Sequence, residues 1–177
     1  MLKVDFLGLA NLDTIEETHA LVNASRENKE DQFNVWKVAL DDEGVYQMLS
    51  RGESVGVFQL ESAGMRDVLK RLKPSCFEDL IAVIALYRPG PMDSIPDFIK
   101  GKEHPEDIEY AHPWLEPILS TTYGQIVYQE QVMEIVRQMA GYSYGRSDLV
   151  RRAMSKKKPD VLAAERVVFI NGRDNPD

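Results

Sequence analysis

The longest apolar run in the chain, 80-LIAVIALY-87, constrains the fold more than any other segment. Glu78 and Asp79 lie just before it, where acidic residues favour the start of a helix. Two prolines and a glycine in 88-RPGPM-92 then force the chain out of the helix. Because a helix that is apolar nearly all round is buried, we expect residues 77–87 to form the central element of a helical body.

Apolar residues at helical spacing predict further helices on both sides of this element. We expect helices at 13–22, 42–52, 61–74, 113–120, 128–140 and 147–157, and another that begins at Pro159. The opening 2-LKVDFLGL-9 alternates apolar and polar residues in part, so it predicts a short strand. The polar run 23–32 indicates a linker. The fold class is therefore predicted as mainly α with a few short β-strands.

The charge of the chain is distributed unevenly. Its 29 acidic residues outnumber its 21 Lys and Arg, and the net charge of −8 argues against a general nucleic-acid coating protein. Yet six of the basic residues lie between Arg146 and Lys158, beside a single acid, Asp148. The one cysteine, Cys76, excludes an internal disulfide framework and fits a reducing compartment. The acidic chain thus carries one focused basic segment.

On a helix, this segment divides into two faces. The apolar face is expected to point to the core and holds Leu149, Val150, Ala153 and Met154. The opposite face holds Arg151, Arg152, Ser155 and Lys156, and Asp148 can offset the charge of Arg152. Two interpretations stay open: an anion site for several phosphates, because Arg binds phosphate oxygens in pairs, or a solvated helix end.

Two further residues carry open alternatives. Asp5 lies between Val4 and Phe6 and either points to solvent or serves as a Mg²⁺ ligand. One carboxylate cannot hold two metal ions, and the chain has no D-x-D partner for it. Arg88, locked before Pro89, is either a partner of the helix dipole or a guanidinium aimed at a ligand. No Walker loop, G-x-S-x-G or G-x-G-x-x-G motif is found in the sequence.

Five segments in register resemble the C-family replicative polymerases, the alpha subunits of bacterial DNA polymerase III. They are KVDFLGL, GVFQLES, DLIAVIALYRPGPM, TTYGQIVYQEQVM and AGYSYGRSDLVRRAMSKKKP. Their order and spacing match the family from Lys3 to about Gly172. The resemblance implies that residues 1–25 form the C-terminal edge of a nucleotidyltransferase-like palm domain, as a strand and a helix. It implies that residues 26–177 form a helical fingers domain, truncated at its C-terminal end.

The resemblance also implies roles for individual residues. Asp5 matches a metal-binding aspartate of the palm, and Lys3 matches a basic residue close to it; the family's other two aspartates lie in a D-x-D segment that is absent here. The nucleotide-binding surface of the fingers would be formed by Arg88, Arg151, Arg152, Lys156 and Lys157. Ser155 stands where many relatives carry Gly, a change that removes no charge from the site.

The implied function is that of a fragment of a replicative DNA-directed DNA polymerase, inactive by itself. The implied cofactor of the full enzyme is Mg²⁺. The implied partners are dNTP, primer–template DNA, the rest of the polymerase chain and the replisome subunits, with no membrane, in the cytoplasm of a bacterium. From the residues alone, one alternative of another class stays open: a helical protein-interaction module with a basic docking helix and no catalytic role. A free-standing nucleic-acid binder fits the net charge least well.

Overall fold

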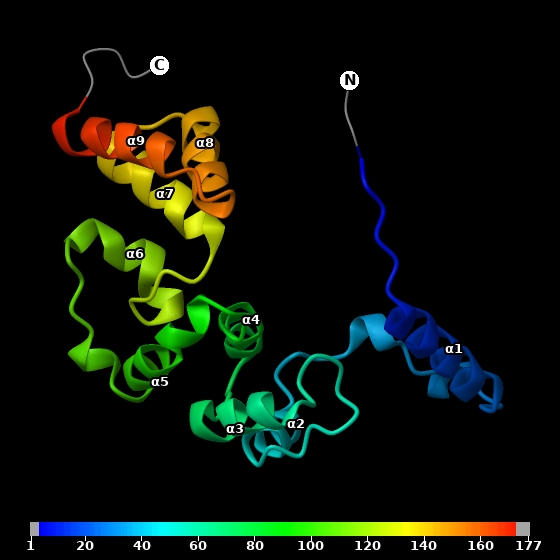
Figure 1. The fold of residues 1–177 in the computed structure, drawn as a ribbon. Coiled ribbons are helices and arrows are strands. Elements are labelled where there is room, and N and C mark those ends of the chain that lie inside the picture. The colour runs from blue at the N-terminus through cyan, green and yellow to red at the C-terminus, as the bar shows by residue number, and fades with distance from the viewer. Residues whose placement is uncertain (1–3, 173–177) are drawn as a thin grey trace.

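The computed structural model describes residues 4–172 and consists of helices and connecting segments in that range (Figure 1). The α-helices are α1 (Ala10–Ala24), α2 (Glu43–Ser50), α3 (Ala63–Leu72), α4 (Phe77–Leu86), α5 (Ile95–Glu103), α6 (Glu116–Leu119), α7 (Gln129–Ala140), α8 (Tyr144–Ser155) and α9 (Pro159–Asn171). Short 3₁₀ turns are η1 (Lys29–Asp31), η2 (Val35–Lys37), η3 (Pro91–Ser94), η4 (Pro105–Asp107), η5 (Pro113–Leu115) and η6 (Ser120–Thr122).

The prediction of short β-strands is wrong for the described residues, which contain no strand. Residues 4–9 run as an exposed segment into α1, so the predicted strand–helix edge of a palm domain is not seen. The physical reason is that a strand is stabilised by backbone hydrogen bonds to a neighbouring strand, and residues 4–172 supply none. Alternating residues alone therefore did not produce a strand, and Phe6 and Leu7 are both almost fully exposed.

The larger core lies between α2, α3, α4 and α5. Its largest fully buried apolar side chains are Leu49, Leu69, Val83, Leu86 and Phe98. Helix α4 contributes Ala82, Val83 and Leu86 from one face, whereas Phe77 and Ile81 are 40% and 45% exposed. The expectation that this helix is buried all round is therefore correct for one face only.

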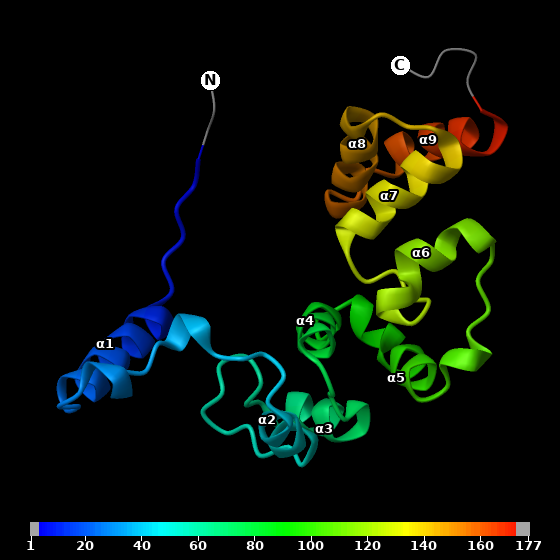
Figure 2. The same cartoon turned by 180° about the vertical axis from the view of Figure 1, so that it is seen from behind.

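A smaller core joins α7, α8 and α9 around Val136, Tyr142 and Val150. Figures 1 and 2 show these three helices grouped at one end of the molecule, with α1 standing apart at the other. Helix α1 has no buried residue, and its contacts include the hydrogen bonds of His19 and Asn23 to the Phe33 carbonyl. None of the helices in residues 4–172 is both long and apolar enough to cross a membrane.

Candidate functional site

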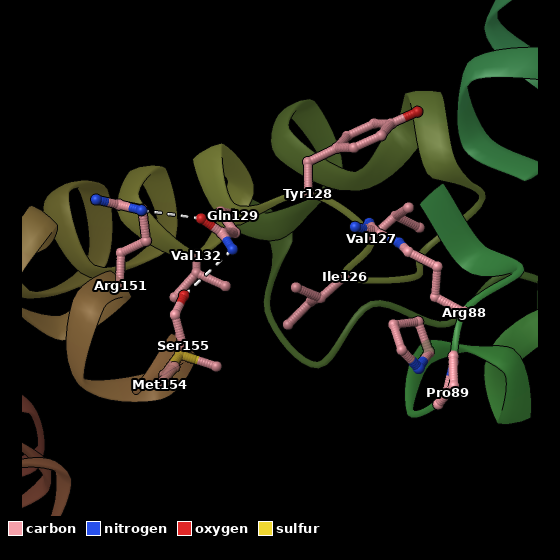
Figure 3. Close-up of a pocket in the computed structure, with 11 residues that line it drawn as sticks. Arg88, Pro89, Ile126, Val127, Tyr128, Gln129, Val132, Arg151, Met154 and Ser155 are labelled. Atoms are coloured by element: carbon pink, nitrogen blue, oxygen red, sulfur yellow. Dashed lines mark hydrogen bonds between the residues drawn. The ribbon is translucent and has the colours of Figure 1, made fainter. Parts of the chain in front are cut away.

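A cavity of about 490 Å³ lies between the turn after α4 and the basic helix α8 (Figure 3). Its walls come from the R-P-G-P turn, from residues 126–129, from Val132 of α7, and from Met154 and Ser155 of α8. Two cationic residues line it: Arg88 on the turn and Arg151 on α8. The fold thus brings together two residues that stand 63 positions apart in the chain and that the sequence singles out independently.

The turn fixes Arg88 next to the end of α4. Helix α4 stops at Leu86 because Pro89 and Pro91 follow closely, and Gly90 adopts a φ of 108°, which favours glycine. The Nε of Arg88 donates to the carbonyl of Ala85 over 3.0 Å. Arg88 is therefore a partner of the C-terminus of α4, which is one of the two predicted roles. This hydrogen bond uses Nε and leaves the two Nη groups of the exposed side chain for contact with a ligand. Figure 3 shows the side chain running toward Val127.

Helix α8 is held by its buried face. Its N-cap, Ser143, accepts a hydrogen bond from the backbone of Arg146, and Val150 and Ala153 are buried as the apolar periodicity predicts. The same periodicity predicts that Leu149 and Met154 face the core, but they are 42% and 48% exposed. Met154 lies instead against the cavity, so the core-facing arc of this helix is narrower than predicted.

One carboxylate, Asp148, contacts both arginines of the opposite face. Its Oδ1 lies 2.6 Å from Nη2 of Arg151, and its Oδ2 lies 2.7 Å from Nη2 of Arg152. The hydrogen bond from Arg151 holds the pKa of Asp148 below its usual value, and the charge of Arg152 acts in the same direction. The predicted offset of Arg152 by Asp148 is confirmed. Because one negative charge faces two positive charges, the group stays cationic.

A residue of α7 also holds Arg151. The Nη1 of Arg151 donates to Oε1 of Gln129 over 3.0 Å, and Nε2 of Gln129 donates to Oγ of Ser155 over 3.2 Å (Figure 3). The side chain of Gln129 therefore links two points of α8, one turn apart, at the wall of the cavity.

The lysines after Arg152 form the turn that ends α8. The backbone N–H of Lys158 bonds to the carbonyl of Ala153, and that of Lys157 bonds to Met154, which is a Schellman motif. Its left-handed position, with φ of 49°, is occupied by Lys157. Lys156 and Lys157 are exposed, and neither forms an ion pair with another residue in 4–172. Together with Arg152 they lie outside the lining of the cavity.

Arg146 differs from the other basic residues of the segment. Its Nη2 lies 2.9 Å from a carboxylate oxygen of Glu165 on α9, and its guanidinium stacks 4.3 Å from the ring centre of Tyr142. With only 12% of its side chain exposed, it joins α8 to α9 instead of facing a ligand.

The comparison with known proteins decides the family. The family model for the bacterial DNA polymerase III alpha subunit finger domain matches residues 11–176. The chain belongs to this finger-domain family. Its similarity to the C-family polymerases, inferred above from five segments, is confirmed.

Curated relatives support the same assignment. The chain is 53% identical over 172 residues to DNA polymerase III subunit alpha of Halalkalibacterium halodurans. This match covers 97% of the chain and 15% of that protein. It is 49% identical to the Staphylococcus aureus protein of the same name over 97% of the chain and 16% of the relative. The Staphylococcus epidermidis protein is 49% identical over 175 residues, which is 99% of the chain and 16% of that relative. The chain thus spans about one sixth of these alpha subunits.

The polymerase family implies Mg²⁺, and the described residues do not form a site for it. Among residues 4–172, no group of three or more acidic, His or Cys side chains is placed to hold a metal ion. Asp5 offers one carboxylate on the exposed segment before α1, and Figures 1 and 2 show this segment well apart from α8. Lys3 lies outside the described residues. The structure therefore brings Arg88 and Arg151 of the predicted finger-domain site together, and Asp5 lies elsewhere.

Sequence reasoning missed Gln129 and the apolar lining residues Ile126 and Val132. A local pattern did not single out Gln129, because its contact to Arg151 spans 22 positions and depends on how α7 packs on α8. Three tyrosines near these helices make contacts within the fold: Tyr123 contacts Phe98 edge-on, Tyr142 is buried, and the guanidinium of Arg137 lies over the ring of Tyr144. The boundary between palm and fingers after residue 25 stays a prediction.

Proposed function

We propose that this finger domain binds the triphosphate of an incoming dNTP in a replicative DNA-directed DNA polymerase. The observation that carries the proposal is the cavity between the R-P-G-P turn and α8, with Arg88 and Arg151 in its lining. Its volume of about 490 Å³ lies in the usual range for small-molecule sites. Guanidinium groups on two walls suit a ligand that carries several phosphates, because each can bind two phosphate oxygens.

The cationic residues outside the lining extend this surface. Arg152, Lys156 and Lys157 continue the positive face past the mouth of the cavity, and Asp148 removes only one of these charges. A polyphosphate is longer than one guanidinium, so charges spread along a helix face can contact successive phosphates. Lys supplies point charges to such a ligand, while Arg fixes its geometry.

The apolar part of the lining supports a nucleotide over inorganic polyphosphate. Pro89, Ile126, Val132 and Met154 form a surface without formal charge next to the arginines. A sugar or base has apolar faces that can pack on such a surface while the phosphates contact the cations. The cavity therefore combines the two kinds of contact that a nucleoside triphosphate needs.

In the proposed reaction, the 3′-hydroxyl of a primer attacks the α-phosphate of the dNTP, and pyrophosphate leaves. The finger domain would hold the triphosphate in line and spread positive charge over it. Asp5 would contribute one carboxylate to a Mg²⁺ site whose other ligands belong to parts of the polymerase beyond this chain. Such an ion stabilises charge on phosphate oxygens.

The remaining partners follow from the same proposal. Primer–template DNA, the rest of the polymerase chain and the replisome subunits would contact other surfaces, in the cytoplasm of a bacterium. A chain that supplies one metal-binding carboxylate would not catalyse nucleotidyl transfer alone.

The test is steady-state nucleotide incorporation by the full-length polymerase that carries this chain. Arg151→Ala and Arg88→Ala are expected to raise KM for dNTP by about tenfold or more, because each removes charge-assisted hydrogen bonds to phosphate. Arg51→Ala is the control, since Arg51 pairs with Glu53 on the surface over 2.8 Å and lies outside this cavity. If both cavity variants keep the KM of the unmodified polymerase, the proposal is rejected.

A further inference from the structure

The side-chain contacts of Arg151 use only part of its hydrogen-bonding capacity. A guanidinium has five N–H groups: one on Nε and two on each Nη. The Nε and Nη2 of Arg151 donate to Oδ1 of Asp148 over 2.8 and 2.6 Å, and Nη1 donates to Gln129 over 3.0 Å. Each nitrogen therefore has one partner, and a second N–H remains on Nη1 and on Nη2. The Nη1 and Nη2 atoms form one edge of the planar fork, and such an edge can bind two phosphate oxygens at once.

The two partners hold the guanidinium from different helices. Asp148 lies one turn before Arg151 on α8, and Gln129 is the first residue of α7. A contact from one helix alone would leave the guanidinium free to rotate about that contact. Contacts from two directions fix its plane, and the cavity lies between the elements that supply them.

Gln129 is itself held in place. Its amide nitrogen donates to Oγ of Ser155, so its oxygen is the atom turned toward Arg151 (Figure 3). The guanidinium of Arg151 can only donate, so it selects this amide orientation, and the Ser155 hydroxyl, which can donate or accept, accommodates it.

We propose that Gln129 and Asp148 are positioning residues, which orient the Nη1–Nη2 edge of Arg151 for two oxygens of the dNTP triphosphate. This inference rests on the proposed function of the cavity. Asp148 acts here through Arg151 and does not repel the ligand decisively, because its one charge is opposed by Arg151 and Arg152 together. Neither residue is assigned a contact with the nucleotide.

The experiment measures KM for dNTP and kcat of the full-length polymerase with single variants in this network. Gln129→Met keeps the volume of the side chain but removes both hydrogen bonds. Asp148→Asn removes the charge that holds Arg151. Each is expected to raise KM about three- to tenfold, with kcat changed less, because an arginine held in fewer orientations binds the ligand at lower cost in entropy.

Rescue and control variants separate positioning from folding. Asp148→Glu keeps a carboxylate within reach of Arg151 on the same helix and is expected to retain a KM near that of the unmodified polymerase. Glu134→Gln is the matched control, because Glu134 forms the same kind of ion pair, one turn apart, with Arg137 over 2.7 Å on α7. It is expected to leave KM unchanged. A fall in thermal midpoint without a change in KM counts against positioning.

Double variants distinguish failure of this inference from failure of the proposed function. In an Arg151→Ala background, Gln129→Met and Asp148→Asn are expected to raise KM no further, since the residue that they position is gone. If Arg151→Ala raises KM and the two single variants do not, positioning is rejected and the nucleotide site stands. If each variant raises KM equally in both backgrounds, it acts through another group, which also rejects positioning. If Arg151→Ala itself has no effect on KM, both proposals fail.

Discussion

The ammonium nitrogen of Lys102 lies 2.6 Å from a carboxylate oxygen of Asp79, whose side chain is only 2% exposed. The same nitrogen donates to the carbonyl of Lys73 at the end of α3, so one ion pair connects α3, α4 and α5. Asp79 also accepts hydrogen bonds from the backbone N–H of Ser75 and from the hydroxyl of Tyr123. The buried charge is thus compensated on several sides.

Asp79→Ala is expected to destabilise the chain by about 3 kcal/mol, because it leaves Lys102 as a largely buried charge without its partner. Urea denaturation followed by circular dichroism measures the change. Glu53→Ala is the control: it breaks an ion pair of similar length, Arg51 to Glu53 at 2.8 Å, on the surface. That variant should keep the denaturation midpoint of the unmodified chain. Equal shifts for both variants would contradict the role given to burial.

Tyr123 makes the same network sensitive to alkaline pH. Burial, followed by the nearby charge of Asp79, raises the pKa of Tyr123 from its ordinary value of 10.0 to about 12. The folded chain therefore favours the neutral phenol. This contribution to stability is complete below about pH 10, the value in an unfolded chain, and is lost as the pH rises toward 12.

We expect the unmodified chain to lose stability between about pH 10 and 12 more steeply than Tyr123→Phe, which has no phenol to ionise at this position. Urea midpoints measured at several pH values give the two slopes. At neutral pH, Tyr123→Phe should be less stable by about 1 kcal/mol, because the hydrogen bond to Asp79 is lost. Parallel slopes in the alkaline range would show that Tyr123 titrates as an ordinary tyrosine.

Gly101 of α5 allows the segment after η6 to approach closely. A Cβ at this position would lie 2.8 Å from Cβ of Tyr123 and 2.9 Å from its carbonyl oxygen, and the backbone cannot move aside easily. We therefore expect Gly101→Ala to destabilise the chain by about 1–3 kcal/mol despite the better helix propensity of Ala. Gly145→Ala in α8 is the matched control, because a Cβ there meets nothing within 4 Å. It should stabilise the chain by up to about 1 kcal/mol. Thermal or urea denaturation of both variants checks the opposite signs.

The sequence predicts helices well where the signal is local. Periodicity located α7 within one residue at its start, and Gly141, with φ of 68°, ends it. The helix predicted at 147–157 begins earlier, at Tyr144, and ends at Ser155. Its end could not be placed, because the left-handed residue is Lys157, and no glycine marks the position.

Parts of the fold and the site that depend on distant contacts could not be predicted. A strand needs a neighbour, so the alternation in residues 4–9 was insufficient. In the site, the pair of Asp148 and Arg152 follows from their spacing on a helix, and it is found at 2.7 Å. The contact of Gln129 with Arg151 arises only when α7 packs on α8. The sequence therefore shows which charges share a helix face, whereas packing determines which of them reach the cavity.

The turn that ends α8 allows charge and backbone strain to be tested at one residue. The left-handed position of a Schellman motif usually holds glycine, because a side chain there costs about 1 kcal/mol. Here it holds Lys157, with φ of 49°. A lysine retained in this conformation is consistent with the proposed contact to phosphate, since strained residues gather at functional sites.

Lys157→Gly is therefore expected to stabilise the chain by up to about 1 kcal/mol while it raises KM for dNTP in the full-length polymerase by about threefold or more. Lys157→Arg keeps both the charge and the strain, so it should change neither quantity much. Lys37→Ala removes a lysine from η2, far along the chain from α8, and serves as the control for loss of charge alone. Opposite directions of stability and affinity at one position indicate a residue kept for binding. A glycine variant with improved stability and unchanged KM would instead assign Lys157 to the solvated end of the helix.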